Sequence, residues 1–546
     1  MKFDTDVLIA GGGPVGMTLA LDLARRGVRS IVAERNPTTT AHPKMDITNA
    51  RSMELFRGVG MAEALRRVAV PEAHCFDVAW VSAMNGHELH RFRYPSVDEH
   101  RRLARANNDG SWPAEAPMRV SQVVIEPALR AAIEAEPLVD VRFGVALEDF
   151  TQDDDGVDAV LRNRDAGTAL RVRSRYLAGC DGGSSRVREC LGIGLAGDMN
   201  LMQRYMVHFR SARRDLLMRW GIAWHYQSSL GTLIAQNDRD VWTLHARLPR
   251  DTALDAIDPV DLVAGFAGER VEIEVLVANP WVPHLVVAES YGCGRVVLAG
   301  DSAHQYIPTG GYGMNTGVCE AFDLGWKLAA LIKGFGGPDL LASYALERRP
   351  VALRNCEAAR RHTEVRAQIG ALYIPTLHQT GPAGDACRRE AASRIAALGN
   401  AENGSWGIEH GYAYRDSPLV AVEPDAQWID DPLVYHPTTA PGARLPSVFL
   451  ADGSRLYDRL SRWFTLLVAG DGSASTGTFE QAARAIGAPL AVVRLDDPAL
   501  APIYAADLVL VRPDHHVAWR GAAPPSPGEA LAILRRALGW NFQEPT

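Results

Sequence analysis

A glycine-rich turn near the N-terminus constrains the fold of this chain more than any other feature. Residues 5–10 (TDVLIA) predict a short buried strand, residues 15–26 predict a helix, and residues 30–33 predict a second strand. The segment between the first strand and the helix, residues 11–16, satisfies the pattern G-x-G-x-x-G. Strand, glycine turn, helix and strand in this order predict a dinucleotide site, with the pyrophosphate at the helix N-terminus.

The positions of this motif have separate expected roles. Gly11 would form the tight turn, Gly13 would let the backbone approach the pyrophosphate, and Gly16 would allow close helix–strand packing. Glu34, at the end of the second predicted strand, is placed to bind a ribose. A purely structural turn is the alternative, and the strand–helix–strand context favours the nucleotide site.

Two later segments could contribute to the same site. Residues 177–188 (LAGCDGGSSRVR) could also be read simply as a strand that ends in an Asp-Gly turn with a basic helix behind it. Residues 300–317 (GDSAHQYIPTGGYGMNTG) place an acid, Asp301, at a strand end before a glycine loop. Asp301 could bind a polyol, and the loop N–H groups around Gly311 to Asn315 could approach a flat ring. A flexible loop is the alternative. For His304, a buried position near the turn is favoured over a catalytic base.

Composition excludes several classes of protein. The 546 residues suggest three or four domains, and the formal net charge of −8 argues against binding nucleic acid or an anionic membrane. The cysteines form no C-x-x-C pair and the histidines no ligand cluster, so no metal site is expected. Two acids lie where a signal peptide would be basic, and no apolar run reaches the roughly 20 residues of a membrane span. We therefore expect a soluble, cytoplasmic protein.

The rest of the chain divides into segments with different residue patterns. Residues 205–247 contain alternating, aromatic-rich segments that predict antiparallel strands. A helix is predicted from about Thr316 to Lys333, and residues 341–372 predict another helix, broken at Pro350. From about residue 425, Pro-rich turns, short apolar strands and two helices predict a separate small α/β domain.

Together, these motifs resemble those of the class A flavoprotein aromatic monooxygenases. The resemblance covers about residues 4–370 and includes Gln122 in MRVSQVVIEPALR and the segment ERRP at residues 347–350. The tail extends it to the phenol hydroxylase branch, which includes dichlorophenol and polyketide hydroxylases, through PGARLPSVFL, LYDRLSRWFTLLVA and VRPDHHVAWR. Two departures are Lys44-Met45, where many relatives have Arg-Ala, and His515-His516, where they usually have Gly-Tyr.

The resemblance implies an α/β protein with a Rossmann-type FAD-binding domain, an inserted antiparallel-sheet substrate domain and a C-terminal thioredoxin-like domain. These would comprise residues 1–75, 115–190 and 285–395, residues 76–114 and 191–284, and residues 425–546, respectively. No cysteine lies beyond residue 387, so the last domain is expected to pack or to form a homodimer rather than to carry out thiol chemistry. The expected cofactor-binding residues are Gly11, Gly13, Pro14, Val15, Gly16, Glu34, Arg35, Lys44, Gln122, Asp181, Gly182, Gly300, Asp301, Pro308, Gly311, Gly313, Met314 and Asn315.

The function implied by the resemblance is hydroxylation of a phenolic ring, ortho to an existing hydroxyl. NADPH or NADH would reduce the FAD, O₂ would form a flavin hydroperoxide, and the phenol would attack its distal oxygen. The chain lacks the second G-x-G-x-x-G and the Cys-x4-Cys of disulfide reductases, and the signatures of flavin halogenases and Baeyer–Villiger enzymes. An epoxidase or ring-modifying monooxygenase acting on a polyketide remains an alternative, as does a flavin-free nucleotide-binding interaction protein.

A catalytic base is expected because a phenolate reacts better than a phenol, and phenols titrate near 10. Asp46 precedes an Arg-Ser-x-Glu helix start at the spacing found in phenol hydroxylases, with Tyr226 and His225 as the next candidates. The alternative is that Asp46 binds loop backbone or pairs with Lys44. The expected substrate-binding residues, between the flavin and the middle sheet, are Trp224, Gln236 and Trp242, with Tyr226 beside them.

Overall fold

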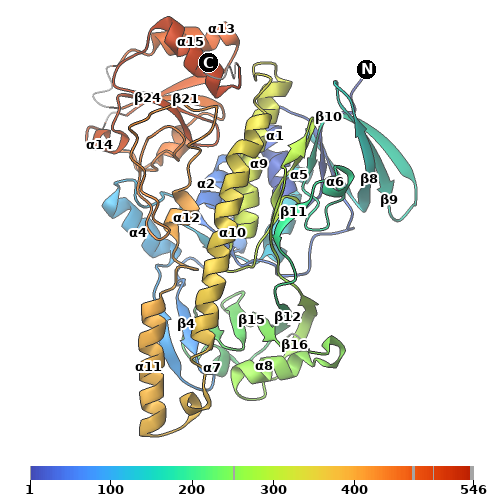
Figure 1. The fold of residues 1–546 in the computed structure, drawn as a ribbon, viewed down its shortest axis with the longest axis vertical. Coiled ribbons are helices and arrows are strands. Elements are labelled where there is room, and N and C mark those ends of the chain that lie inside the picture. Colours follow the sequence, from blue (N-terminus) through green and yellow to red (C-terminus); the bar gives the residue numbers. More distant parts are fainter. Residues whose placement is uncertain (1, 250–251, 470–473, 496, 541–546) are drawn as a thin grey trace.

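The computed structural model describes residues 2–249, 252–469, 474–495 and 497–540. The expected C-terminal domain, residues 425–546, includes residues 470–473, 496 and 541–546, which lie outside the described residues. In Figure 1 the N-terminal sheet occupies the upper right, the C-terminal region the upper left, and a second sheet the lower part. Within the described chain, no helix has both the length and the apolar character needed to cross a membrane.

The N-terminal sheet has the order β18-β19-β10-β1-β2-β7, with the hairpin β8–β9 attached to β10. Its central strands pair in parallel, and β1 lies between β2 and β10. Helix α1 (Pro14–Arg25) starts at Pro14, whose fixed φ suits a first helical turn, and Gly27 ends the turn after it with a φ of 73°. The strands are β1 (Thr5–Ala10), β2 (Ser30–Glu34), β7 (Val139–Phe143), β8 (Val145–Gln152), β9 (Val157–Asn163), β10 (Ala169–Gly179), β18 (Gly292–Cys293) and β19 (Val296–Leu298). The predicted strand–turn–helix–strand start is therefore confirmed.

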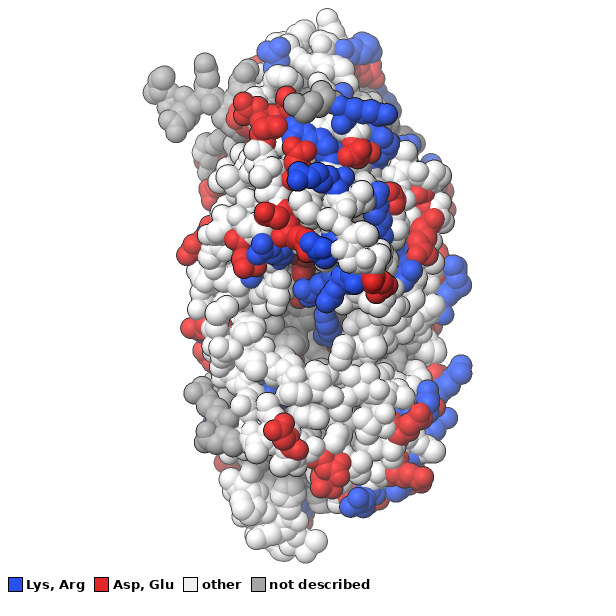
Figure 2. Space-filling view, turned by 90° about the vertical axis from the view of Figure 1, so that its right-hand side faces the viewer, with Lys and Arg blue, Asp and Glu red and all other residues white. Residues whose placement is uncertain are grey.

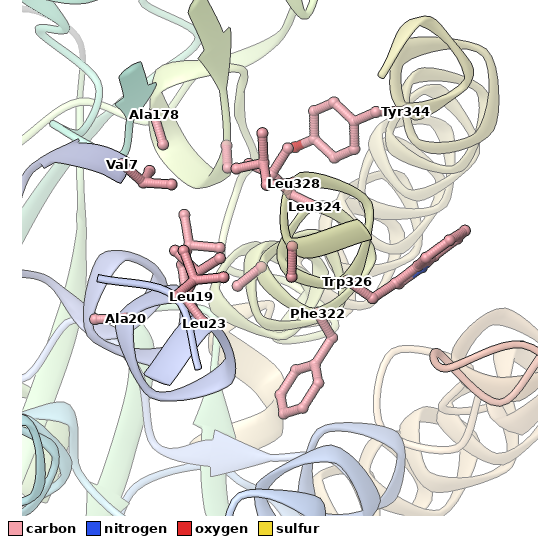
Figure 3. Packing of buried hydrophobic residues seen from close by; sticks show 14 of the residues in the cluster. Val7, Leu19, Ala20, Leu23, Ala178, Phe322, Leu324, Trp326, Leu328 and Tyr344 are labelled. Atoms are coloured by element: carbon pink, nitrogen blue, oxygen red, sulfur yellow. The ribbon is translucent and has the colours of Figure 1, made fainter. Parts of the chain in front are cut away.

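Helix α9 (Tyr312–Ile332) packs beside α1 to form the core of this part. Figure 3 shows Leu19 and Leu23 of α1 directed toward α9, which presents Leu324 and Phe322. The prediction that α9 begins near Thr316 was wrong by one turn. Gly311 has a φ of 65°, a conformation that favours glycine, and this places the N-cap directly before Tyr312.

Smaller elements surround this core. The helices are α2 (Ala50–Gly58), α3 (Ala62–Val68), α5 (Gln122–Glu134) and α6 (Arg186–Cys190). Strand β3 (Ile47–Thr48) pairs with β6 (Met118–Arg119), and β17 (Leu285–Ala288) lies between β11 (Leu195–Asp198) and β20 (His304–Gln305). The 3-10 turn η2 (Gly300–Ser302) leads into the glycine loop before α9.

The second sheet has the order β16-β12-β15-β14-β13-β4-β5. Its strands are β4 (Val78–Val81), β5 (Glu88–Phe92), β12 (Gln203–Arg210), β13 (His225–Ser228), β14 (Gly231–Ala235), β15 (Val241–Leu248) and β16 (Glu274–Trp281). The antiparallel strands predicted within residues 205–247 are confirmed. One face of the sheet packs on α7 (Arg214–Leu217) and α8 (Pro259–Ala267) through a core that includes Val207, Phe209 and Leu244.

Helix α10 (Ala342–Gly370) runs from the upper part of the molecule to the lower part (Figure 1). It is continuous through Pro350, so the predicted break was wrong. A proline inside a helix removes one backbone hydrogen bond. Buried contacts hold the residues before it, because Glu347 pairs with Lys327 and Arg348 donates to the Tyr414 hydroxyl at 3.0 Å.

The C-terminal sheet has the order β22-β21-β23-β24, and β21 pairs in parallel with β22 and antiparallel with β23. Its elements are β21 (Phe464–Val468), α13 (Gly477–Ile486), β22 (Leu490–Arg494), α14 (Ala501–Tyr504), β23 (Leu508–Val511), β24 (Val517–Gly521) and α15 (Pro527–Ala537). The predicted strands and helices of the tail are confirmed. The elements between α10 and this sheet are η3 (Pro375–His378), α11 (Pro382–Leu398), α12 (Trp406–His410) and η4 (Leu456–Arg459). Two further elements lie in earlier connections of the chain, α4 (Val97–Asn107) and η1 (Leu254–Ala256).

Candidate functional site

A cleft of about 710 Å³ extends from the carboxyl ends of β1 and β2 to the end of β16 on the second sheet. Ligands of parallel α/β sheets bind at this end of the strands. Figure 2 shows a hollow between the upper and lower parts of the molecule, with basic side chains gathered above it. The cleft size suits an extended organic cofactor, because ligand pockets commonly measure about 300–1,000 Å³.

Glycines make the floor of the cleft. A Cβ added at Gly13, Gly182 or Gly313 would meet no protein atom within 4 Å, and all three residues line the cleft. A Cβ at Gly11 or Gly16 would instead collide with backbone, 2.2 Å from Cys180 O and 2.1 Å from Gly11 O. Two glycines of the motif therefore serve close packing, and the third leaves open space for a ligand to approach the backbone.

Two of the acidic residues along the cleft, Glu34 and Asp301, differ in whether their carboxylates are already engaged. The Glu34 carboxylate accepts hydrogen bonds from the backbone N–H groups of Gly12 at 2.7 Å and Asn36 at 2.8 Å, which holds it beside the glycine turn. Asp301 is exposed on η2, lines the cleft and makes no hydrogen bond to any described residue. Its carboxylate is free to accept from a bound ligand.

His304 lies behind Asp301 and is fully buried. Its Nε2 is 3.1 Å from Glu320 Oε2, which also accepts the Gly300 N–H at 2.8 Å. The buried position favoured from the sequence is confirmed, and the imidazole does not face the cleft.

The other expected cofactor residues divide into two groups. Those that line the cleft are Pro14, Val15, Arg35, Lys44, Gln122, Asp181, Pro308, Gly311 and Met314. Gly300 and Asn315 do not line it. The Asn315 side chain accepts the Asn49 N–H at 3.0 Å and donates to Gly311 O at 2.7 Å, so it joins the N-terminus of α9 to the segment after Asp46.

Asp181 has a structural role for its carboxylate. The carboxylate accepts the backbone N–H groups of Arg186 at 2.7 Å and Val187 at 3.1 Å, at the start of α6. The simple Asp-Gly turn weighed from the sequence accounts for this side chain, while the neighbouring Gly182 backbone faces the cleft.

Asp46 stands in the wall between the cleft and a smaller cavity, which we call the chamber. Its Oδ2 accepts hydrogen bonds from Trp224 Nε1 at 2.5 Å and His225 Nε2 at 3.0 Å. Burial alone would raise the pKa of the Asp46 carboxyl, but the charge and hydrogen bond of His225 and the Trp224 N–H hold that pKa below its ordinary 3.8. The carboxylate is therefore ionised at neutral pH.

The chamber lies between Asp46, the second sheet and α10. The charged and polar residues of its wall include Lys44, Asp46, Arg204, His225, Gln236, His245, Arg247, Arg366 and Glu402. Because successive strand residues alternate between faces, His225, His245 and Arg247 point to the chamber.

Two expected residues lie on the other face of this sheet. Tyr226 and Trp242 are buried in the core against α7 and α8, and the Tyr226 hydroxyl donates to Gly221 O. The expectations that Trp242 lines the substrate pocket and that Tyr226 accepts the substrate proton are corrected by this alternation. Trp224 packs edge-to-face on Phe76 with ring centroids 6.0 Å apart and lines a separate small pocket, whereas Gln236 lines the chamber.

Four basic residues of the chamber were not predicted from the sequence: Arg204, His245, Arg247 and Arg366. A signal was present on β15 (VWTLHARL), where His245 and Arg247 stand two residues apart in a mostly apolar strand. That pattern indicates a strand with one face in the core and the other face polar.

Two family models match the chain, an FAD binding domain over residues 4–359 and an aromatic-ring hydroxylase C-terminal domain over residues 438–545. The FAD-dependent monooxygenase apdD of Emericella nidulans is 38% identical over 98% of this chain and 90% of its own length. The 2,4-dichlorophenol 6-monooxygenase of Cupriavidus pinatubonensis is 30% identical, covering 99% and 97%. The solved structure of native and K252c-bound RebC-10x superposes with a TM-score of 0.89 at 35% identity, covering 99% and 100% of the two chains. The chain belongs to the class A FAD-dependent aromatic monooxygenases.

Proposed function

We propose that this monooxygenase hydroxylates a phenolic ring ortho to an existing hydroxyl group, using O₂ and NADPH or NADH. In the overall reaction an aryl C–H bond becomes C–OH, the second oxygen atom leaves as water, and NAD(P)H is oxidised. The observation that carries the proposal is the Asp46 carboxylate, which lies between the cofactor cleft and the chamber and is held there by Trp224 and His225.

The residues of the cleft fit FAD. The open glycines Gly13, Gly182 and Gly313 leave room where a Cβ would obstruct a pyrophosphate or a flat ring, and the Asp301 carboxylate is available to a polyol. The N-terminus of α1 adds a favourable field for phosphate. When bound, the FAD supplies the activation of O₂. The chain supplies binding, orientation and proton handling.

Asp46 and His225 act on the phenol proton in this proposal. An ionised Asp46 accepts from His225 Nε2–H, and this hydrogen bond fixes the orientation of the imidazole ring beside the carboxylate. His225 Nδ1 has no partner among the described residues, and no described residue donates to Asp46 Oδ1. The Asp46 carboxylate, positioned by His225, can therefore accept a hydrogen bond from a phenol at Oδ1 and take up its proton, which makes the ring more electron-rich at the reacting carbon.

We also propose the division into domains expected from the sequence, with a Rossmann-type FAD-binding domain, an inserted substrate domain and a thioredoxin-like C-terminal domain. The first and second sheets fall within the expected segments, which supports the division. For the C-terminal domain we propose packing and pairing of two subunits. Its buried ion pairs to the FAD-binding part, Arg512 with Glu347 and Arg444 with Glu54, support the packing role.

A panel of phenols tests the proposed activity. FAD-loaded enzyme should oxidise NAD(P)H faster with its phenolic substrate than without, and the product should gain one oxygen atom with the new hydroxyl beside the old one. Product structure determined by mass and NMR separates this outcome from an epoxide or a rearranged ring of a polyketide substrate. Purified protein without bound flavin or NAD(P)H oxidation would favour the flavin-free alternative.

A further inference from the structure

The chamber has an excess of positive charge. Of its acidic wall residues, Asp46 is engaged by His225, and Glu402 is paired with Arg366. Arg204 and Arg247 also line the chamber, and neither guanidinium makes a hydrogen bond or ion pair to any described residue. Two largely buried cations thus face one cavity without a counter-charge.

The sheet register brings these two cations together. Arg204 on β12 and Arg247 on β15 are directly opposite each other on neighbouring antiparallel strands. Like charges at opposed positions destabilise a sheet, and burial adds a desolvation cost. Burial, reinforced by the neighbouring arginines, lowers the pKa of Arg204 to about 9 and that of Arg247 to about 10, so both remain charged at neutral pH.

The same wall contains unsatisfied polar atoms. Gln236 Oε1, His245 Nδ1 and Trp281 Nε1 are buried without a partner among the described residues, as is Arg247 Nε. Buried polar groups in proteins nearly always have hydrogen-bond partners. Of these atoms, Arg247 Nε and Trp281 Nε1 are hydrogen-bond donors, the type of group that binds an anion.

We propose that the substrate carries a carboxylate and that Arg204 and Arg247 bind it, so that the attached ring lies toward Asp46 and the cofactor cleft. Guanidinium groups match the planar oxygens of a carboxylate and form its strongest hydrogen bonds. The inference rests on the proposed function, whose ring it orients, and it narrows the substrate class from phenols to acidic phenols. Arg204 and Arg247 are thereby the residues that determine substrate specificity.

Binding to the oxidised, FAD-loaded enzyme tests this without turnover. The probes are matched pairs in which only the acid differs: 2-hydroxybenzoate with 2-methylphenol, and 3-hydroxy-2-naphthoate with 3-methyl-2-naphthol. Binding is measured by the change in flavin absorbance and by calorimetry. In at least one pair the acid should bind roughly 10- to 100-fold more tightly, the range expected for hydrogen bonds to a charged group. No preference for the acid in either pair, including failure of both acids to bind, overturns the proposal.

The variants Arg204→Met and Arg247→Met should remove that preference and leave binding of the neutral partner unchanged, while Arg247→Lys restores part of it. Arg239→Met, an exposed arginine in the same part of the chain, is the matched control and should change neither affinity. The melting temperature of either Met variant without ligand should equal or exceed that of the parent, because an unpaired buried charge has been removed. If a Met variant melted at a lower temperature and lost affinity for the acid and the neutral probe equally, the arginines would have a structural role only. That result would overturn the proposal.

Two further outcomes are decisive. A rise in the KM for NADPH with no change in affinity for either phenol would assign the arginines to the reductant and overturn the proposal. Tight, arginine-dependent binding of an acid that is never hydroxylated would support the anion site and count against the proposed function alone.

Discussion

The cofactor cleft and the chamber adjoin each other at Asp46, yet they are built in different ways. Around its glycine turns the cleft exposes backbone, because a Cβ added at Gly13, Gly182 or Gly313 would meet no protein atom within 4 Å. The chamber is mostly side chain, projected from one face of the second sheet and from α10. The difference indicates that the two regions have separate roles. The shape of the cleft binds the cofactor, and the side chains of the chamber select the substrate.

The two regions should therefore respond differently to mutation. In the cleft, a single added branch obstructs the cofactor without disturbing the protein. In the chamber, a substitution should leave the cofactor in place and change which substrate is bound or how fast it reacts. We order the substitutions that test this comparison from the largest expected effect to the smallest.

The largest effect is expected at Gly13. Gly13→Val should yield folded protein almost without flavin, because a Cβ at this position enters the space left for the pyrophosphate and meets no protein atom within 4 Å. Gly13 has a φ of −77°, which valine adopts without strain. Flavin content per subunit, read from the absorbance of purified protein, measures the effect.

Gly265→Val is the matched control. Gly265 is exposed on α8, and a Cβ there also meets nothing within 4 Å, but it lies outside the cleft. This variant should retain full flavin occupancy. Asp301→Ala should lower flavin affinity less than Gly13→Val, since it removes one acceptor rather than space. Full flavin occupancy in Gly13→Val would show that the cleft does not hold the pyrophosphate at this turn.

The second effect is expected at Asp46, where cleft and chamber meet. Asp46→Asn should keep FAD and lose hydroxylation roughly 10²- to 10⁴-fold at pH 7, the contribution typical of a positioned acid or base. NAD(P)H oxidation should continue and release hydrogen peroxide. Because the pKa of Asp46 lies below 3.8, the parental carboxylate is ionised at every pH from neutral upward.

The pH dependence of the hydroxylation rate lost in Asp46→Asn should therefore reflect only the ionisation of the substrate. This loss of rate should shrink as the pH rises toward the phenol pKa near 10. Asp215→Asn, an exposed carboxylate on α7, is the control and should match the parent at all pH values. Product formation at the parental rate near pH 7 would exclude Asp46 as the group that handles the phenol proton.

The contrast between the regions also explains what could be predicted from the sequence. Backbone sites have short, contiguous signatures, so the turn at residues 11–16 and the acid Asp301 were visible as motifs. The chamber has no such signature, because Arg204, Arg247 and Arg366 become neighbours only through strand pairing and the position of α10. Neighbouring strand residues face opposite sides of a sheet, and the sequence left these faces open. Tyr226 and Trp242, which lie in the core, were therefore predicted together with His225 and Gln236, which line the chamber.

The third test asks whether the cleft depends on the C-terminal region behind it. Arg512 is fully buried and donates to Glu347 on α10, Asp323 on α9 at 3.1 Å and Asp514 at 2.8 Å. Arg512→Leu removes a buried positive charge that these carboxylates share. The substitution should therefore destabilise the protein by about 3–5 kcal/mol. Urea unfolding measures the change.

Arg535→Leu, at an exposed position on α15, should change stability by no more than about 0.5 kcal/mol. Removal of everything after residue 420 should have a larger effect than Arg512→Leu, giving insoluble or flavin-poor protein. A soluble, dimeric and fully active truncation would show that the C-terminal region supports neither the cleft nor the subunit contact.

The smallest effect is expected at Tyr226, and it sharpens the comparison because the residue beside it should behave oppositely. Tyr226 faces the core, where its hydroxyl donates to Gly221 O and burial raises its pKa to about 12, so it cannot accept a proton at neutral pH. Tyr226→Phe should cost about 0.5–1.5 kcal/mol of stability for one hydrogen bond and leave kcat/KM unchanged. His225→Gln, one residue earlier on the same strand, faces the chamber and should lower the rate while preserving stability. Equal losses of activity in the two variants would mean that the faces of β13 are assigned wrongly, and the chamber would then need a different wall.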